Sequence, residues 1–416
     1  MNNTQKPSKS FGDRLTEFFT NNHGKAASIS SKSVAFETIS PPKPELRRKA
    51  QLKYRSRVIR SSNAIAHLEY SPTSIPEKPL VEGEEWTRFV CISDTHTHEI
   101  EVPDGDVLLH SGDLTNLGTE KDFEKTMKWL CGLPHKVKII IAGNHDLTLH
   151  TDWYEKHSPN FHLRAGKQDI NKILPLLKGK GAQASNLVYL QDEVYRFKLK
   201  ENGREWSVYG SPWSPEFCNW AFGYEPEDGK ALVSKFPQTD ILLTHGPPYA
   251  LLDLTTTGEL AGCKALRKRL ASLKPRLHLF GHIHEAHGAY LHEWDKGATL
   301  PKVQNHEERG VEDSTSLEAE LERLYVPQGL DEEQQNYTAD NDDAELEEDF
   351  SSDDGLGNLD EEGNGKEKSQ NAPSERPTLF VNAAAWPMGK LASRDGPKMN
   401  MFGGPGFQAV IVDLKD

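Results

Sequence analysis

Five apolar runs, each followed by polar side chains, constrain the fold of this chain most strongly. The central run is Ile139-Ile140-Ile141-Ala142-Gly143, and Asn144-His145-Asp146 follows it directly. A short β-branched run of this kind predicts a buried strand that opens into a polar loop. The other runs are 89–92 before Asp94 and His96, 107–110 before Asp113, 241–244 before His245, and 277–280 before His282 and His284. Carboxylate, imidazole and amide groups without a thiolate indicate one shared metal centre.

The order of elements around these runs predicts a parallel α/β sheet. Thr119 to Asp122 form a capping-box pattern, and Phe123, Met127 and Leu130 follow at helical spacing. This helix lies between predicted strands 106–110 and 136–142, and strand 88–93 precedes them. A strand, a helix and a strand favour a right-handed parallel unit. Because chemistry in such sheets lies at the carboxyl ends of the strands, all five polar clusters are expected at one edge.

The same periodicity arguments predict the remaining elements. A hairpin is expected where Asn202-Gly203 separates two candidate strands. We expect helices near 169–177, 226–236 and 262–273, and strands at 187–190, 194–199, 205–209, 240–244, 276–280, 287–292, 378–382 and 407–414. The rest of 150–185 is predicted as loop.

Charge is distributed very unevenly along the chain. Residues 1–80 contain 14 Lys and Arg against 6 Asp and Glu, whereas residues 301–370 contain 5 against 23. Both segments lack sustained hydrophobic periodicity, which predicts disorder. We therefore predict a disordered basic tail at 1–85, a folded domain at 86–295 plus 377–416, and an acidic disordered insertion at 296–376. The net charge of −14 belongs mostly to the insertion and says little about the substrate.

Cysteine usage and hydropathy bear on the compartment. The four cysteines show no paired spacing and lie in or beside apolar runs, so we expect reduced thiols. No apolar run approaches the length of a membrane span, and the N-terminus lacks a signal-peptide core. We expect an intracellular protein, in the cytoplasm. The basic run from Arg47 to Arg60 leaves a nuclear address open.

Seven of the polar side chains are candidate metal ligands: Asp94, His96, Asp113, Asn144, His245, His282 and His284. Imidazole and carboxylate donors suit Zn²⁺, Mn²⁺ or iron. Seven donors exceed what one ion needs, but they fit two ions that share a bridging carboxylate. Such a pair can hold a bridging hydroxide and stabilise both oxygens at a phosphoryl centre.

These motifs, in this order, resemble the calcineurin-like metallophosphoesterase superfamily, and in particular the branch of metallophosphoesterase domain-containing proteins with its fungal relatives. The similarity covers about 86–295 and 377–416. It rests on Asp94-x-His96, Gly112-Asp113, Gly143-Asn144-His145-Asp146, Gly210-Ser211-Pro212-Trp213, Thr244-His245-Gly246-Pro247-Pro248 and Gly281-His282-Ile283-His284. The resemblance implies a four-layer αββα sandwich of two mixed β-sheets flanked by helices.

The resemblance also implies a role for each residue. The first metal would be held by Asp94, His96, Asp113 and His284, and the second by Asp113, Asn144, His245 and His282. Asp113 would then bridge the two ions, which could be Mn²⁺, Fe²⁺/Fe³⁺ or Zn²⁺. His145 would be the general acid for the leaving group, and Asp146 would orient its imidazole and raise its basicity.

The function expected on this basis is hydrolysis of phosphodiesters, cyclic nucleotides among them. The alternatives are a phosphomonoesterase or protein phosphatase, and a weakly active metal-binding scaffold. We expect a small phosphoester or nucleotide as substrate rather than a nucleic acid, because the folded part is slightly acidic. One hypothesis for the acidic insertion is that it binds a partner protein, and another is that it folds over the basic tail or the active-site rim and autoinhibits the site.

Several residues near the motifs have a more ordinary interpretation. We expect His98 to lie beyond the ligand set, and His110 and His278 to be core histidines with hydrogen-bond partners. The loop from Gly210 to Pro215 is interpreted equally well as a pocket wall or as a surface-packed loop.

Overall fold

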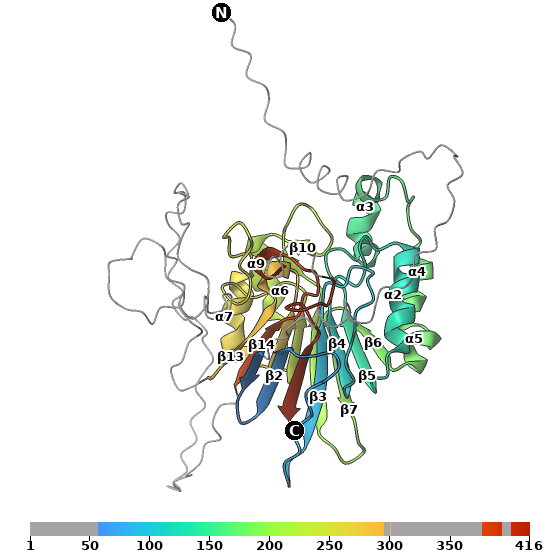
Figure 1. Ribbon diagram of the computed structural model, residues 1–416. Coiled ribbons are helices and arrows are strands. Elements are labelled where there is room, and N and C mark those ends of the chain that lie inside the picture. Colours follow the sequence, from blue (N-terminus) through green and yellow to red (C-terminus); the bar gives the residue numbers. More distant parts are fainter. Residues whose placement is uncertain (1–56, 295–299, 301–376, 393–400) are drawn as a thin grey trace, which may run out of the picture. The chain divides into compact units, whose positions relative to one another are not determined.

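The computed structural model describes residues 57–294, 300, 377–392 and 401–416, in which two mixed β-sheets lie face to face (Figure 1). The seven-stranded sheet has the order β1 (Arg57–Arg60), β2 (Ala64–Glu69), β15 (Val410–Lys415), β3 (Trp86–Ile92), β4 (Val107–Ser111), β5 (Val137–Ile141), β6 (Leu187–Leu190). The six-stranded sheet has the order β13 (Gly288–His292), β14 (Thr378–Asn382), β12 (Leu277–Phe280), β11 (Ile241–Thr244), β8 (Glu205–Ser211), β7 (Glu193–Lys198). A short parallel pair joins β9 (Ser214–Pro215) to β10 (Gly223–Tyr224).

Parallel strands form the centre of each sheet. In the first sheet β3, β4, β5 and β6 pair in parallel, and in the second sheet β8, β11, β12 and β14 do so. The loops after these strands lie at the upper edge in Figure 1, whereas antiparallel β15 ends at the lower edge. The predicted right-handed connections therefore bring all five polar loops to one edge of the sandwich.

Alternation along the strands builds three separate cores. Side chains of one parity, such as Phe89 and Leu243, are fully buried between the two sheets. Side chains of the other parity face the helices: Leu108 packs with Phe123 of α2, and Leu242 packs with Leu266 of α7. Because successive side chains of a strand point to opposite faces, each apolar run supplies two cores at once.

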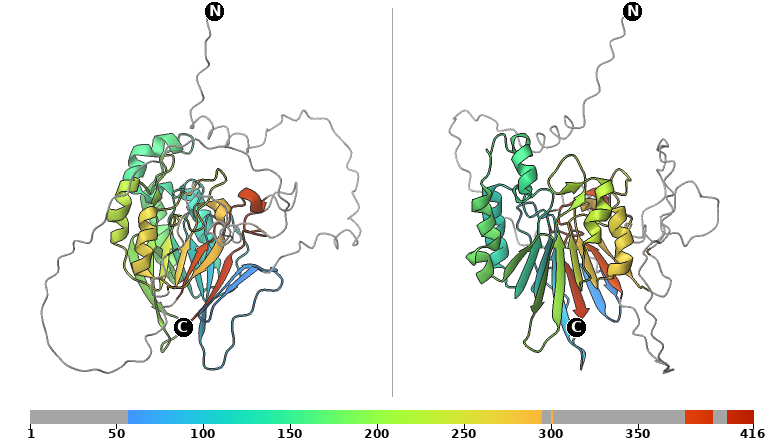
Figure 2. Two further views of the ribbon diagram at one scale, coloured as in Figure 1. Left: turned by 90° about the vertical axis from the view of Figure 1, so that its left-hand side faces the viewer. Right: turned by 180° about the vertical axis from the view of Figure 1, so that it is seen from behind.

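Besides the strands, the described residues form helices and 3₁₀ turns, some of which cover the outer faces of the two sheets (Figure 2). The helices are α2 (Glu120–Gly132), α3 (Thr151–Phe161), α4 (Ile170–Lys178), α5 (Lys180–Ala184), α6 (Gly229–Ser234), α7 (Lys264–Leu273) and α9 (Gly389–Ala392), with the 3₁₀ turns η2 (Leu147–Leu149), η3 (Pro226–Asp228) and η4 (His284–Ala286). Helices α2, α4 and α5 lie beside the first sheet, and α6 and α7 beside the second. This is the four-layer sandwich predicted from the sequence.

Local signals predicted the start of α2 correctly. Thr119 is its N-cap, with a hydrogen bond from the Asp122 backbone N–H to the Thr119 side chain and the reciprocal bond also present. Strands β7 and β8 form the expected hairpin, with a loop at 199–204 that contains Asn202 and Gly203. Helices α3 and α5 were missed, because 150–185 was predicted as loop with a single helix. Pro159 lies inside α3 and obscured the helical pattern.

The predicted boundary of the folded domain at residue 86 is wrong. Residues 57–60 and 64–69 form β1 and β2, and β2 pairs with β15 from Ala64↔Leu414 to His67↔Ile411. Ala66 and Leu68 are buried in this sheet. The short, alanine-containing β2 carries a weak strand signal, and of its two partners β1 has only four residues while β15 lies more than 300 residues away in the chain. The predicted tail from 1 to 56 lies outside the described residues.

The two ends of the predicted acidic insertion are adjacent in space. His292 of β13 pairs with Thr378 of β14, and the Trp294 indole N–H donates to the Thr378 hydroxyl at 2.7 Å. Leu300 is buried against this region, and the remainder of 296–376 lies outside the described residues. β13 ends and β14 begins at the edge of the sheet that lies opposite the polar loops, so both ends of the insertion are at that edge. Among the described residues, no helix is long and apolar enough to cross a membrane.

Candidate metal centre

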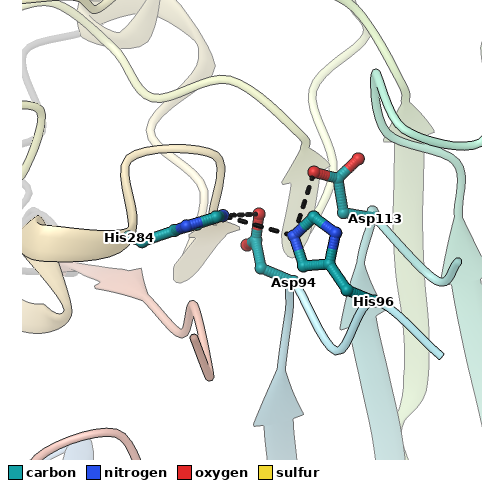
Figure 3. A group of neighbouring side chains, drawn as sticks. All are labelled: Asp94, His96, Asp113 and His284. Carbon is teal, nitrogen blue, oxygen red and sulfur yellow. Dashed lines mark hydrogen bonds and ion pairs between the residues drawn. The ribbon is translucent and has the colours of Figure 1, made fainter. Parts of the chain in front are cut away.

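The structure brings all seven predicted ligands together at the carboxyl ends of the parallel strands. Four of them, Asp94, His96, Asp113 and His284, present ligand atoms that all lie within 4.8 Å of one another (Figure 3). The His284 Nε2 lies 3.2 Å from Asp94 Oδ1 and 3.3 Å from His96 Nε2. His284 reaches this group from the second sheet, whereas the other three residues follow strands of the first.

The other predicted ligands form a second group beside the first. Asn144 Oδ1 lies 2.7 Å from His245 Nε2 and 2.8 Å from His282 Nδ1. Asp113 contacts both groups, because its Oδ2 lies 3.5 Å from His96 Nε2 and its Oδ1 lies 3.5 Å from His245 Nε2. One carboxylate therefore faces three donors on one side and three on the other, as a bridging ligand does.

The direction of the hydrogen bonds leaves ligand lone pairs pointing into the site. His245 Nδ1–H donates to the carbonyl of Ser111 at 3.0 Å, so Nε2 of the neutral ring carries a lone pair toward Asn144 Oδ1 and Asp113. Two acceptors facing each other repel unless a cation lies between them. A backbone carbonyl that fixes the tautomer of a histidine in this way is typical of metal ligands. The donor set thus fits two divalent cations.

Burial favours the protonation states that metal binding requires. It lowers the pKa of His96 and of His282 well below the usual value, with neighbouring histidines adding to the effect, so both rings are neutral. Burial also raises the pKa of Asp113, and the negative charge of Asp94 raises it further. For Asp94 burial acts in the same direction, but the hydrogen bond and charge of His284 bring its pKa below its usual range. Two buried carboxylates at this spacing favour a cation between them.

Backbone strain is concentrated in the ligand residues. Four of the seven adopt the left-handed conformation: Asp94 (φ 53°), His96 (φ 44°), Asp113 (φ 52°) and His282 (φ 69°). This region costs non-glycine residues free energy, and it persists where the surrounding structure requires it, often at functional sites. Gly281 is required for a related reason, because a Cβ there would collide with the side chains of Asp94 and Ser93. The backbone conformation of these loops is therefore locally unfavourable, and it directs the ligand side chains toward the candidate metal site.

His145 lies beside the ligands without joining them. Its backbone N–H donates to Asp113 Oδ1 at 2.8 Å, and its ring Nδ1–H donates to the carbonyl of Asn116 at 2.8 Å. The ring stacks on Trp220 with centroids 4.1 Å apart and meets the His96 ring edge-on at 4.5 Å. Burial lowers the pKa of His145 to about 4, although the hydrogen bond to Asn116 opposes that shift.

The predicted contact between Asp146 and the His145 ring is wrong. The buried Asp146 carboxylate accepts hydrogen bonds from the backbone N–H groups of Leu114, Thr115 and Gly143 and from the Thr115 hydroxyl. These bonds tie the loop after β5 to the loop after β4. The carbonyl of Asn116 takes the orienting role that we had assigned to Asp146. A backbone acceptor leaves no trace in the sequence, which is why this partner was missed.

Two tryptophans that no sequence motif marks border the ligand groups. Trp220 stacks on His145, as described above. Trp386 stacks on His284, with centroids 5.3 Å apart and an angle of 9° between the rings, and meets His96 edge-on at 4.5 Å. Trp386 follows β14, about a hundred residues from His284 in the chain, so no local pattern connects the two.

The other histidines divide as the sequence suggested, with one difference. His98 is exposed, and its Nδ1–H donates to the carbonyl of His96 at 2.9 Å, so it lies outside the ligand groups. His110 and His278 are buried, and each has its Nε2 2.9 Å from a threonine hydroxyl, of Thr95 and Thr244 respectively. The Nδ1 atoms of both lack a partner among the described residues, so these two rings are only half satisfied.

The loop from Gly210 to Pro215 is anchored to the rest of the protein at Trp213. The Trp213 indole N–H donates to Asp192 at 2.8 Å, and the ring packs edge-on against Phe222 at 5.5 Å. Its contacts continue through Phe222 to His150, a residue of the loop after β5. The structure thus favours a packed support of the site over a direct wall.

The chain is similar to several known proteins. Residues 87–286 match the model of the calcineurin-like phosphoesterase family. Human metallophosphoesterase domain-containing protein 1 is 39% identical over 218 residues, covering 49% of this chain and 62% of that protein. A UPF0046 protein of Caenorhabditis elegans is 37% identical, covering 51% of this chain and 73% of that protein.

A protein of Emericella nidulans named probable rhamnogalacturonate lyase C is 36% identical over 253 residues, which cover 60% of this chain. They cover only 22% of that protein, so the match concerns one part of a much longer chain. The chain likewise spans less than two thirds of the human relative. Residues 87–286, which match the family model, include all seven candidate ligands from Asp94 to His284. The chain therefore belongs to the calcineurin-like phosphoesterase family, a family of hydrolases that act on phosphoester bonds.

Proposed function

We propose that this protein hydrolyses phosphodiesters, cyclic nucleotides among them, at a site that holds two divalent metal ions. The observation that carries the proposal is the position of Asp113, whose two carboxylate oxygens face two different groups of donors. Oxygen and imidazole donors without thiolates suit Mn²⁺, iron or Zn²⁺. Asp94, His96, Asp113 and His284 would hold one ion, and Asp113, Asn144, His245 and His282 the other.

Bound metals at such a site polarise the phosphoryl group and make water a nucleophile near neutral pH. The chain's own residues set the geometry for this chemistry. The left-handed backbone at four ligands fixes their direction before any ion binds, and preorganisation of this kind lowers the cost of reaching the transition state. The rings of Trp220 and Trp386 limit the access of water to His145 and His284.

His145 is proposed to transfer a proton to the leaving oxygen. Because Nδ1–H donates to the carbonyl of Asn116, Nε2 is the nitrogen that gains and loses the proton. Burial keeps the free ring neutral at pH 7. A phosphoester anion beside it favours the protonated form, so the proton would be held at Nε2 when substrate is bound. The Nε2–H can then donate to the oxygen as the bond to phosphorus breaks.

Two alternatives remain within the same geometry. A phosphomonoesterase or protein phosphatase would use the same donors, and only the preferred substrate would differ. A weakly active scaffold would bind metals with little turnover, and the acidic insertion at 296–376 would bind a partner protein. The intact donor set and His145 favour an enzyme, because a vestigial site has no need of a proton donor. We further propose an intracellular protein with a small phosphoester as substrate.

The test is an assay of the purified full chain, loaded with Mn²⁺, against four substrate classes. They are an aryl phosphodiester, an aryl phosphomonoester, and nucleoside 2′,3′- and 3′,5′-cyclic phosphates. The proposal expects diesters to be preferred by kcat/KM. Asp113→Ala is the control, and it should lose both metals and activity. A preference for monoesters would favour the phosphatase, and a metal-loaded protein without turnover would favour the scaffold.

A further inference from the structure

An aromatic cluster adjoins the first ligand group. It consists of Trp386, Phe402 and His98, which we call the aromatic shelf. The His98 and Phe402 rings stack, with centroids 3.8 Å apart and an angle of 9°. The Trp386 and Phe402 rings meet edge-on at 4.9 Å. Because Trp386 also stacks on His284 and touches His96, the shelf is continuous with two candidate ligands.

The shelf is only partly buried. Trp386 and Phe402 are half-buried, His98 is exposed, and the neighbouring Met401 is 79% exposed. The Trp386 indole N–H has no hydrogen-bond partner among the residues that the structure describes. Large aromatic rings usually bury their faces and satisfy their polar groups. An aromatic surface left open beside a polar site therefore marks a place where another apolar group binds.

The backbone holds the shelf rigidly against the ligand loop. Ala385 N–H donates to the carbonyl of Ser93 at 2.8 Å, and Gly403 N–H donates to the carbonyl of Ala385 at 3.0 Å. Ser93 directly precedes Asp94, so the segment that carries Trp386 is fixed to the segment that carries the first ligand. Gly403 adopts φ +63° and packs on Ile100, where a Cβ would lie 2.8 Å from the Ile100 Cβ. The rings thus have a fixed position relative to the phosphate-binding groups.

We propose that the aromatic shelf binds a planar aromatic group of the phosphoester whose phosphate occupies the metal site. Rigid rings beside the ligands offer a π surface at a low cost in conformational entropy. Every nucleobase, and any aryl alcohol, presents a π face, so stacking selects a planar group without reading its edge. The proposal deepens the proposed function, on which it rests, by naming the part of the substrate that selects for nucleotides or aryl esters.

The test compares two ligands that differ only in the planar group. Binding of AMP and of ribose 5-phosphate to the Mn²⁺-loaded full chain is measured by calorimetry, which requires no turnover. Stacking of one base contributes about 5- to 100-fold in affinity, so AMP should bind tighter by that factor. Trp386→Leu should remove the preference, measured as the ratio of the two affinities within that variant at equal metal content. Trp386→Phe should retain part of it.

Two further variants separate stacking from a change in the fold. Phe402→Leu removes part of the shelf without touching either candidate ligand, and it should weaken the preference without loss of metal. Trp129→Leu changes a half-buried tryptophan on α2 and should keep the preference intact. Equal affinities in the wild type, or a preference that survives Trp386→Leu, would refute the shelf.

A second pair of ligands tests whether the shelf accepts any aromatic group or only a nucleobase. Phenyl phosphate carries an aryl ring where methyl phosphate carries a methyl group. A gain for phenyl phosphate equal to that for AMP would show that the shelf accepts any aromatic group, whereas a gain for AMP alone would assign it to bases. Absence of phosphodiesterase activity would overturn the proposed function, and the binding comparison would still decide the shelf.

Discussion

Replacement of His145 by alanine should separate metal binding from proton transfer. The Nδ1–H of the His145 ring donates to the carbonyl of Asn116, and the hydrogen bond to Asp113 comes from the His145 backbone N–H rather than from the ring. Alanine keeps this N–H, which lies 2.8 Å from Asp113 Oδ1. We therefore expect His145→Ala to bind as much metal as the wild type.

In His145→Ala, kcat should fall by the factor that a positioned general acid contributes. Such a group is worth about 10²- to 10⁴-fold, or about 3–5 kcal/mol of activation free energy. The loss should depend on the leaving group, because an acidic nitrophenol leaves without a proton and a ribose oxygen does not. The defect should thus be larger for cyclic nucleotides than for a nitrophenyl diester. Loss of the ring from its stack on Trp220 should cost about 1–2 kcal/mol of stability.

The assay measures kcat for both substrates together with metal content by mass spectrometry and the free energy of unfolding in urea. His145→Gln is a matched variant that fills more of the space without acting as an acid. The reasoning fails if His145→Ala loses its metals, since the ring would then be a ligand. It also fails if both substrates slow equally, since the ring would then do no more than shape the site.

Three further predictions concern the frame around the site. Asp146→Asn replaces a carboxylate that accepts four hydrogen bonds with an amide that has one acceptor oxygen, so the free energy of unfolding in urea should fall by about 2–4 kcal/mol. An unchanged value would contradict the assigned hydrogen bonds. Gly112 adopts φ +98°, and a Cβ in Gly112→Ala would lie 2.6 Å from His245 Nδ1, so the metal content measured by mass spectrometry should drop. Full metal occupancy would show that the loop can move to accommodate the methyl group. Asp413→Ala leaves Arg88 buried without its partner, which accepts from Arg88 at 2.7 and 2.8 Å, and should cost about 3–5 kcal/mol in the same urea measurement. A cost under about 1 kcal/mol would mean that water reaches the pair.

The convergence of the candidate ligands could be predicted because they lie where parallel strands end. Each apolar run supplied its own evidence for a strand, and the convergence of carboxyl ends placed residues as distant as Asp94 and His284 in one site. The capping box at Thr119 was equally local. These features depend on residue types at short spacing, which a single sequence displays in full.

What could not be predicted depends on contacts across the sheets. Trp386 reaches His284 only because β14 pairs with both β12 and β13. Strands β1 and β2 are short, and what ties them to the sheet is the pairing of β2 with β15, more than 300 residues away. Asp146 was given the wrong partner because neighbours in sequence need not face each other in a turn. The backbone groups that satisfy it have no signature in residue type.

The origin of the ligands also connects the metal site to the architecture. Asp94, His96, Asp113 and Asn144 follow strands β3, β4 and β5 of the first sheet, whereas His245, His282 and His284 follow β11 and β12 of the second. Each proposed ion therefore draws ligands from both sheets. The core between the sheets sets the distance between the two sets of loops, because Phe89 and Cys91 pack there with Leu243 and Leu279. A substitution in that core should alter the spacing of the candidate ligands without contacting any of them, because tightly packed interiors transmit strain.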